Sequence, residues 1–274
     1  MLKQRLLTAA VLIPFIVCSI IFLPSSIFQY LLAGIVILAG IEWFSIIGFV
    51  KPNKQLFAFV SLLLAVVLLA FLPASLLLSL AIIVWTVIVS FVIIFAHKTL
   101  PKCIGAVFTN SNIALTMAVL VLALFWHGGM YLHASSIIGP QQLLYVMVLV
   151  WLADTGGYFA GKRWGKTPLA KAISPNKTWQ GVAGAFFLGT IWSVLGFYLD
   201  FAGSLSLMSW LLLSVIALST SIVGDLFESL FKRCYQVKDS GNLLPGHGGM
   251  LDRIDSLIAA VPVFTAGLYL LGAW

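Results

Sequence analysis

Nine apolar stretches make up most of this 274-residue chain, and they decide what it can fold into. They run over residues 6–23, 27–50, 56–72, 74–96, 113–130, 143–160, 182–199, 207–226 and 254–274. A helix that crosses a bilayer needs roughly 17 to 25 mostly apolar residues, so these stretches are of the right length. Hydrophobic residues are 62% of the chain, far above their share in a soluble domain. The sequence therefore predicts an all-α polytopic membrane protein with about nine spans.

The basic residues set the expected topology, because short loops rich in Lys and Arg stay on the cytoplasmic side of a membrane. If the N-terminus is cytoplasmic, nine spans place all 15 Lys and Arg residues in cytoplasmic segments. The expected outer loops, such as 127–142 and 200–206, carry none. We therefore expect a multi-pass protein of the inner (cytoplasmic) membrane with its C-terminus outside. The net charge of +7 reflects this topology and does not indicate a nucleic-acid partner.

The N-terminal residues 1–24 imitate a secretory signal, but no small-x-small cleavage site follows, so we expect an uncleaved first span. The break at residues 23–26 leaves open whether the first two spans form a shallow hairpin. We expect one integrated membrane domain with two regions. Residues 1–140 carry little chemistry except Glu42, whereas residues 141–274 hold the cytoplasmic loops 161–181 and 227–253.

Acidic residues gather late in the chain, where six of the eight lie on the expected cytoplasmic side. Asp225 and Glu228 are three residues apart and share a helix face, as do Asp252 and Asp255. A carboxylate inside a membrane helix costs at least about 2.5–3.5 kcal/mol on insertion scales, so it favours a cationic partner or a bound cation. Two simpler alternatives stay open, an ion pair with a nearby basic residue for Glu228 and helix capping for Asp255.

The stretch KDSGNLLPGHGGMLDRID, residues 238–255, is the most polar part of the chain, with five ionisable groups, one histidine and four glycines. Glycines let a backbone approach a ligand and direct successive N–H groups at an anion. Carboxylates interleaved with cations suit a site that holds Mg²⁺ through oxygen ligands and a polyphosphate through positive charge.

The loop 161–181 carries five cations. Its GKRWGKT run is not a phosphate-binding P-loop, because only three residues separate the glycines at 161 and 165 and a membrane helix precedes them. Snorkelling to the interface explains Lys162, Arg163 and Lys166 as well as substrate binding does. The turn SPNKT at 174–178 presents a lysine and hydroxyls, and Asp154 is a candidate third carboxylate.

Three motifs, SLFKR at 229–233, KDSG at 238–241 and PGHGGMLDRID at 245–255, closely resemble the long signature of the phosphatidate cytidylyltransferases, or CDP-diacylglycerol synthases. The resemblance extends to DTG at 154–156 and SPNKTW at 174–179, and it is closest to bacterial members. It covers the second half of the chain well and the first half by hydropathy alone. It implies a membrane enzyme that uses Mg²⁺ to convert CTP and phosphatidic acid into CDP-diacylglycerol and pyrophosphate. It also implies a homodimer with active sites facing the cytoplasm.

The resemblance and the local chemistry together give the expected site. Asp225 and Asp252 are the expected Mg²⁺ ligands, supported by Asp255 and Glu228, and these two pairs leave room for a second cation. The other expected catalytic, phosphate-binding and nucleotide-binding residues are Lys232, Arg233, Lys238, Asp239, Ser229, His247, Gly248, Gly249, Arg253, Lys177 and Ser174.

Two alternatives to this function remain at this point. A transporter would use Asp154 and Asp225 to relay protons or ions, and it would place carboxylates near mid-membrane in halves related by inverted symmetry. A cytidylyltransferase acting on another lipid phosphate would share the nucleotide-binding residues, so only lipid competition separates it from the expected enzyme.

Overall fold

The structure of the chain is a computed structural model that describes residues 2–96, 108–241, 243 and 248–273. Its helices are α1 (Leu2–Phe22), α2 (Ser25–Ile46), α3 (Pro52–Ala70), α4 (Ala74–Phe95), α6 (Ser111–Ala134), α7 (Gly139–Trp164), α8 (Trp179–Tyr198), α9 (Leu207–Cys234), α10 (Leu251–Ile254) and α11 (Leu257–Leu270). Between α7 and α8, the strands β1 (Pro168–Ala170) and β2 (Ser174–Thr178) pair as an antiparallel hairpin.

The predicted architecture is confirmed. Within the described residues, eight helical segments are long and apolar enough to cross a membrane, and α1 adds a shorter apolar stretch, Ala10–Phe22. The small β-hairpin and the short α10 are regular elements that the sequence does not predict.

Prolines and polar caps set the starts of the helices. Pro24 and Pro73 stand directly before α2 and α4, and Pro52 is the first residue of α3. Proline suits these positions because it has no N–H to leave unpaired and its φ is already near the helical value. The hydroxyls of Thr178 and Ser206 accept backbone N–H groups in the first turns of α8 and α9.

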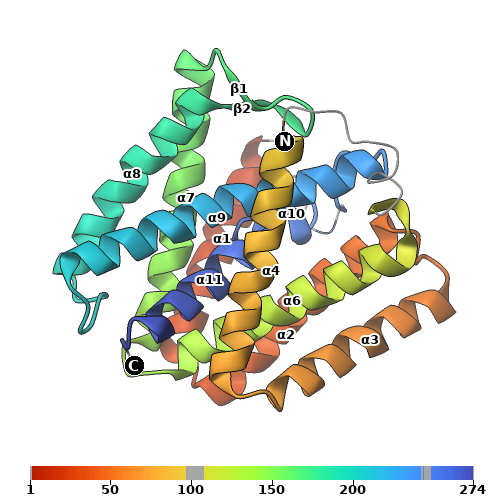
Figure 1. Cartoon of the computed structure of the whole chain (residues 1–274), viewed down its shortest axis with the longest axis horizontal. Helices are drawn as coiled ribbons and strands as arrows, with labels where there is room; N and C mark the ends of the chain where they lie inside the picture. Colours follow the sequence, from red (N-terminus) through yellow and green to blue (C-terminus); the bar gives the residue numbers. More distant parts are fainter. Residues whose placement is uncertain (1, 97–107, 242, 244–247, 274) are drawn as a thin grey trace.

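The centre of the bundle is α11, which packs against α4, α6, α7 and α9 (Figure 1). Its residues from Leu257 to Ala266 are buried. At Gly128 of α6, an added Cβ would lie 2.7 Å from the Cα of Pro262, so these two helices touch through their backbones. Membrane helices associate through such close packing of small residues, because lipid offers them no hydrophobic driving force.

The pair α7 and α8 is packed in the same way and carries the hairpin at its end (Figure 1). A Cβ added to Gly156 would collide with the carbonyl of Gly184, and a Cβ added to Gly184 would collide with Ala160. The contact fixes the separation of the two helices. The hairpin that joins them therefore starts and ends at a fixed spacing.

Several helices extend beyond their predicted ends, among them two that carry residues of the expected site. The sequence predicts ends at 160 and 226, but α7 ends at Trp164 and α9 at Cys234. In α9 the extra turns continue the apolar face, since the ring of Phe231 lies 5.4 Å from that of Trp43 on α2. Basic residues in the last turn of both helices also interact favourably with the helix dipole. The predicted loops 161–181 and 227–253 are correspondingly shorter, and they contain the β-hairpin and α10.

Candidate active site

Ionisable side chains from α7, β2, α9 and the α10 region interact with one another. Among these elements, β2 belongs to the hairpin, which lies at one end of the bundle, away from the C-terminal end of α11 (Figure 1). The acidic members are Asp154, Asp225, Glu228, Asp252 and Asp255, and the basic members are Lys177, Lys232 and Arg253. Each of these residues interacts electrostatically with at least one other member. The sequence prediction that these carboxylates gather at one end of the protein agrees with this arrangement.

The first part of the site is an ion pair between Lys177 of β2 and Asp225 of α9. The Ser229 hydroxyl, one turn along α9, donates to Asp225 Oδ1 at 3.3 Å and so helps to orient the carboxylate. Lys177 and Asp225 line a cavity of about 340 Å³, together with Asp154 and Thr178. Much of the remaining wall is glycine and aliphatic side chains of α7, α8 and α9. The cavity therefore combines a charged end with an apolar wall.

The hairpin that carries Lys177 is tied to the bundle at its turn. Arg233 Nε donates to the carbonyl of Ile173 at 3.3 Å, and the Ala172 N–H donates to the carbonyl of Ala96 at 3.2 Å. Ser174, a predicted ligand-binding residue, lies in β2 opposite Ala170. Arg233, predicted to bind phosphate, thus contacts the backbone that positions Lys177.

The second part of the site is centred on Lys232. Its Nζ lies 2.6 Å from Glu228 Oε2 and 2.9 Å from Asp252 Oδ1. The three side chains are largely buried, with exposed fractions of 14% for Lys232, 1% for Glu228 and 12% for Asp252. Glu228 Oε1 has no hydrogen-bond partner among the described residues. The structure thus contains the ion pair that was the alternative interpretation of Glu228, with Lys232 as the basic partner.

Backbone N–H groups fix the orientation of Asp252. Its Oδ2 accepts from the N–H of Ser240 at 3.2 Å and from that of Gly249 at 2.9 Å. Gly248 has a φ of +80°, and a Cβ there would lie 2.8 Å from Asp252 Oδ2. The sequence predicts that the glycine-rich loop directs N–H groups at a bound anion. In the structure, the N–H of Gly249 is directed at Asp252 instead.

Asp255 joins the cluster because α9 and α11 approach closely. A Cβ on Gly224 would lie 2.6 Å from the carbonyl oxygen of Asp255. The Asp255 carboxylate accepts the N–H of Ser256 at 2.6 Å and interacts electrostatically with Asp225 and Glu228. It is therefore part of the same charged group and is more than a local helix cap.

The remaining predicted residues lie around this core. Lys238 and Asp239 are exposed on the loop after α9. Arg253 is also exposed and interacts electrostatically with Asp154. His247 lies outside the described residues. Among the cations of α7, Lys162 lies over the ring of Tyr158 at 5.5 Å, which favours the snorkelling interpretation for that residue.

One residue of the site has no predicted role. Glu42, near the end of α2, accepts hydrogen bonds from Ser240 Oγ at 3.2 Å and from the Leu251 N–H at 2.8 Å. It therefore contacts both ends of the glycine-rich loop. A signal was available, because Glu42 is the one acidic residue before Asp154 and a carboxylate in an apolar segment marks function or pairing.

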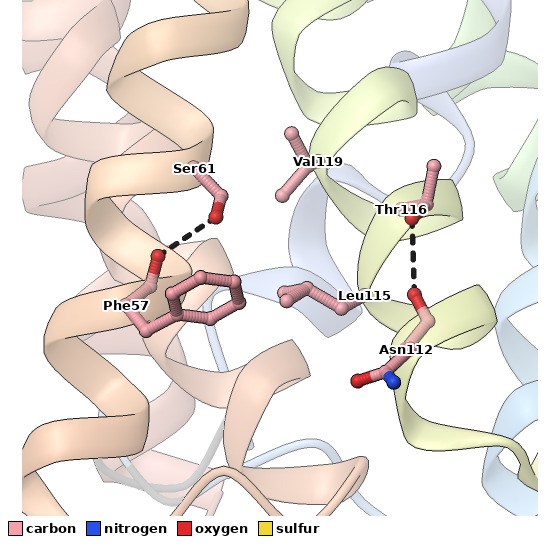
Figure 2. A pocket seen from close by; sticks show the side chains of 6 residues that line it. All are labelled: Phe57, Ser61, Asn112, Leu115, Thr116 and Val119. Atoms are coloured by element: carbon pink, nitrogen blue, oxygen red, sulfur yellow. Dashed lines mark hydrogen bonds between the residues drawn. The ribbon is translucent and has the colours of Figure 1, made fainter.

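A second hollow, of about 310 Å³, lies between α3 and α6 and has a different character (Figure 2). It is lined by Phe57, Ser61, Asn112, Leu115, Thr116 and Val119, none of which is charged. The hydroxyls of Ser61 and Thr116 donate to carbonyls of their own helices, at 2.8 and 3.0 Å. These hydroxyls are satisfied within their helices, and the hollow lacks the charges that phosphate chemistry needs.

Comparison with known proteins decides the family. A model of the cytidylyltransferase family matches residues 3–271 of the chain. The chain belongs to the cytidylyltransferase family. It is thus an enzyme of the nucleotidyltransferase class, and the transporter alternative is excluded.

Two relatives are similar to this chain along nearly their whole length, and a third along about half of it. A protein of Pseudomonas aeruginosa named phosphatidate cytidylyltransferase is 38% identical over 274 residues, covering 99% of this chain and 98% of its own. A protein of Haemophilus influenzae with the same name is 34% identical over 286 residues, covering 97% and 98%. A third, from Staphylococcus haemolyticus, is 44% identical over 137 residues, about half of each chain.

Proposed function

We propose that this cytidylyltransferase transfers the cytidylyl group of CTP to phosphatidic acid, giving CDP-diacylglycerol and pyrophosphate for phospholipid biosynthesis. The observation that carries the proposal is the cavity beside Lys177 and Asp225, which has a charged end and an apolar wall formed by membrane helices. Such a cavity suits a substrate whose phosphate is at the membrane surface while its acyl chains stay in the bilayer. The names of the full-length relatives support the same substrate.

The reaction makes modest demands on acid–base chemistry. A phosphate monoester has a second pKa of about 6, so at neutral pH the lipid phosphate is largely dianionic and needs little help from a general base. One of its oxygens attacks the α-phosphorus of CTP, and the bond from that phosphorus to the bridging oxygen breaks as pyrophosphate leaves. The protein must align two anions and reduce their repulsion. We assign that role to Lys177, Lys232, Arg253 and Lys238, with Arg233 holding the hairpin.

Mg²⁺ fits the charge of the site. Five carboxylates face three cations in the cluster, which leaves two formal negative charges. Carboxylate oxygens are the hard ligands that Mg²⁺ prefers, and Mg²⁺ in nucleotide sites is held by one or two carboxylates together with substrate phosphates. In the described residues no three or more acidic, His or Cys side chains form a preassembled metal group, so the proposed ion would depend on one or two carboxylates acting together with substrate phosphates.

We propose that Asp225 and Asp252 hold the ion, with Asp255 and Glu228 as supporting groups. When bound, Mg²⁺ would neutralise charge that develops on the transferred phosphate and the leaving group. A second cation in the same cluster remains a prediction.

The orientation in the membrane is part of the proposal. The charged cluster lies at the same end as the hairpin and the basic C-terminal turn of α7 (Figure 1). Loops rich in Lys and Arg stay on the cytoplasmic side of a membrane. We therefore place this end of the protein and the N-terminus on the cytoplasmic side of a bacterial inner membrane, and the C-terminus on the outer side. The homodimer implied by the family resemblance remains a prediction, which the mass of the purified protein in detergent checks.

The test is conversion of phosphatidic acid by the purified protein in mixed micelles with CTP and Mg²⁺, with CDP-diacylglycerol and pyrophosphate measured together. We expect both products in equal amounts, and none with EDTA. Lys177→Met should lower turnover by roughly 100-fold, as loss of one electrostatic group in an active site does. The exposed Lys171 on the same hairpin offers a matched control, and Lys171→Met should leave turnover unchanged.

Competition between lipids separates the remaining alternative. If a prenyl phosphate is converted faster than phosphatidic acid at equal surface concentration, the substrate assignment is wrong although the nucleotide chemistry holds. If folded wild-type protein makes neither product from any lipid phosphate, the proposed function is wrong.

A further inference from the structure

Glu42 is a buried carboxylate far from the signature motifs in sequence. It lies on the buried face of α2 next to Trp43, and its exposed fraction is 7%. Burying a carboxylate in a membrane helix is costly, so the groups that compensate it indicate what it does. Within the part of the chain that the structure describes, Glu42 accepts hydrogen bonds from a hydroxyl and from a backbone N–H.

Both partners belong to the loop that carries Asp252. Glu42 Oε2 accepts from Ser240 Oγ, at the start of the loop, and from the N–H of Leu251, at its end. These partners are 198 and 209 residues away along the chain. A single oxygen of α2 therefore joins the two ends of the loop between Ser240 and Leu251.

Two glycines of the signature fit around this carboxylate. A Cβ on Gly241 would lie 2.5 Å from Glu42 Oε1, and a Cβ on Gly249 would collide with Glu42 Oε2 and with Ser240 Oγ. Neither glycine has a positive φ. The absence of a side chain at 241 and 249 is thus explained by the space that Glu42 occupies, and close approach to a ligand is not needed to account for it.

The contact continues to Asp252 within the loop. Ser240 Oγ, which donates to Glu42, also accepts the N–H of Asp252 at 3.3 Å. The N–H groups of Ser240 and Gly249 in turn hold the Asp252 carboxylate at 3.2 and 2.9 Å. Displacing Ser240 or Gly249 would therefore turn Asp252 away from Lys232.

We propose that Glu42 is a positioning residue of the active site, which sets the orientation of Asp252 through Ser240 and Gly249. The proposal rests on the proposed function, because it assigns Asp252 to the reaction. Glu42 itself contacts neither substrate nor ion in this role. The first half of the chain, which the motifs leave without chemistry, thereby contributes one residue to the site.

Activity gives the first test. Glu42→Ala should lower kcat by about 10- to 100-fold, the usual cost of losing a group that orients a ligand, with a smaller change in the KM for CTP. Glu42→Gln keeps the shape and one acceptor oxygen, so it should be less impaired. The matched control is Gln142→Leu, which removes another buried polar group, one that donates to the Phe201 carbonyl at 3.0 Å near the opposite end of α7. It should lower stability but leave kcat per folded molecule unchanged.

A double-mutant cycle gives a sharper test. Gly241→Ala should be severely impaired alone, because the three atoms nearest to its methyl group all belong to the Glu42 side chain. In Glu42→Ala that space is open, so the combined loss in kcat should be smaller than the product of the single losses by roughly twofold or more. Losses that multiply without coupling would show that Gly241 serves a ligand and would overturn the proposal.

Hydrogen exchange tests the contact without any substrate. In Glu42→Ala, the amides of Ser240, Gly249 and Leu251 should exchange about fivefold faster or more, the effect of losing one hydrogen bond. The control Gln142→Leu should leave these amides unchanged. Unchanged exchange in Glu42→Ala, or a lower melting temperature with normal kcat, would overturn the role of Glu42. An inactive wild type with the expected exchange pattern would instead count against the proposed function.

Discussion

Lys232 forms ion pairs with both Glu228 and Asp252, and replacing it tests how the charges of this site are balanced. Lys232→Met keeps an unbranched apolar stem and removes the ammonium group. Glu228 and Asp252, which are 1% and 12% exposed, would then lie together without their common partner. The change should therefore destabilise the fold in addition to any effect on catalysis.

The size of the effect follows from the burial of the three groups. Removing one partner of a buried ion pair costs about 3–5 kcal/mol, because the other charge is left uncompensated. In a chain of this size, each kcal/mol lowers the melting temperature by roughly 2–4 °C, so the expected decrease is about 6–20 °C.

The assay is thermal unfolding in detergent, followed by tryptophan fluorescence at a fixed heating rate. Glu228→Gln combined with Lys232→Met should recover part of the loss, because it removes one of the two unpaired carboxylates. Lys171→Met, at an exposed lysine, should shift the melting temperature little. The charge-balance reasoning is refuted if Lys232→Met melts within about 2 °C of wild type, since such a shift corresponds to no more than about 1 kcal/mol. It is also refuted if the double variant is no more stable than the single one.

Three further outcomes are expected. Gly184→Leu should separate α7 from α8, because even a Cβ at this position collides with Ala160 and lies 2.5 Å from the Gly156 carbonyl oxygen. The variant should have a lower melting temperature and lose most of its turnover. Normal turnover would contradict the fixed spacing of the two helices. Tyr145→Phe removes a hydroxyl that bonds two serine hydroxyls at 3.0 and 2.6 Å, and it should cost about 1 kcal/mol per bond in stability without changing turnover, as unfolding and activity assays on one preparation will check. Ser229→Ala should reduce turnover by less than Asp225→Asn does, since it removes one orienting hydrogen bond and leaves the carboxylate, and steady-state kinetics of the two variants makes the comparison.

The sequence predicts the fold class well because burial in lipid imposes a simple requirement on every spanning segment. Hydropathy alone locates the spans. It locates the start of α9 but not its C-terminal end, where Phe231 contacts Trp43 of another helix. It also does not predict the β-hairpin, whose strands are three and five residues long and are held by backbone contacts to the carbonyl of Ala96 and by Arg233.

The candidate site was partly predictable for a related reason. The spacing of Asp225 and Glu228, and of Asp252 and Asp255, is local and can be read from helical geometry. The pairing of carboxylates with cations is not local. Lys177 reaches Asp225 from another element, and Glu42 meets Ser240 across 198 residues. Such contacts arise only when helices distant in sequence pack side by side, which local spacing cannot report.

The close approach at Gly224 has a consequence for how the site tolerates change. Asp225 lies on α9 and Asp255 in the turn between α10 and α11, and the distance between α9 and this turn is set where an added Cβ on residue 224 would lie 2.6 Å from the Asp255 carbonyl oxygen. Residue 224 supplies no functional group, yet its small size determines how far apart the carboxylates of the site lie. A larger residue there would keep every charged side chain of the cluster and change the distances between them.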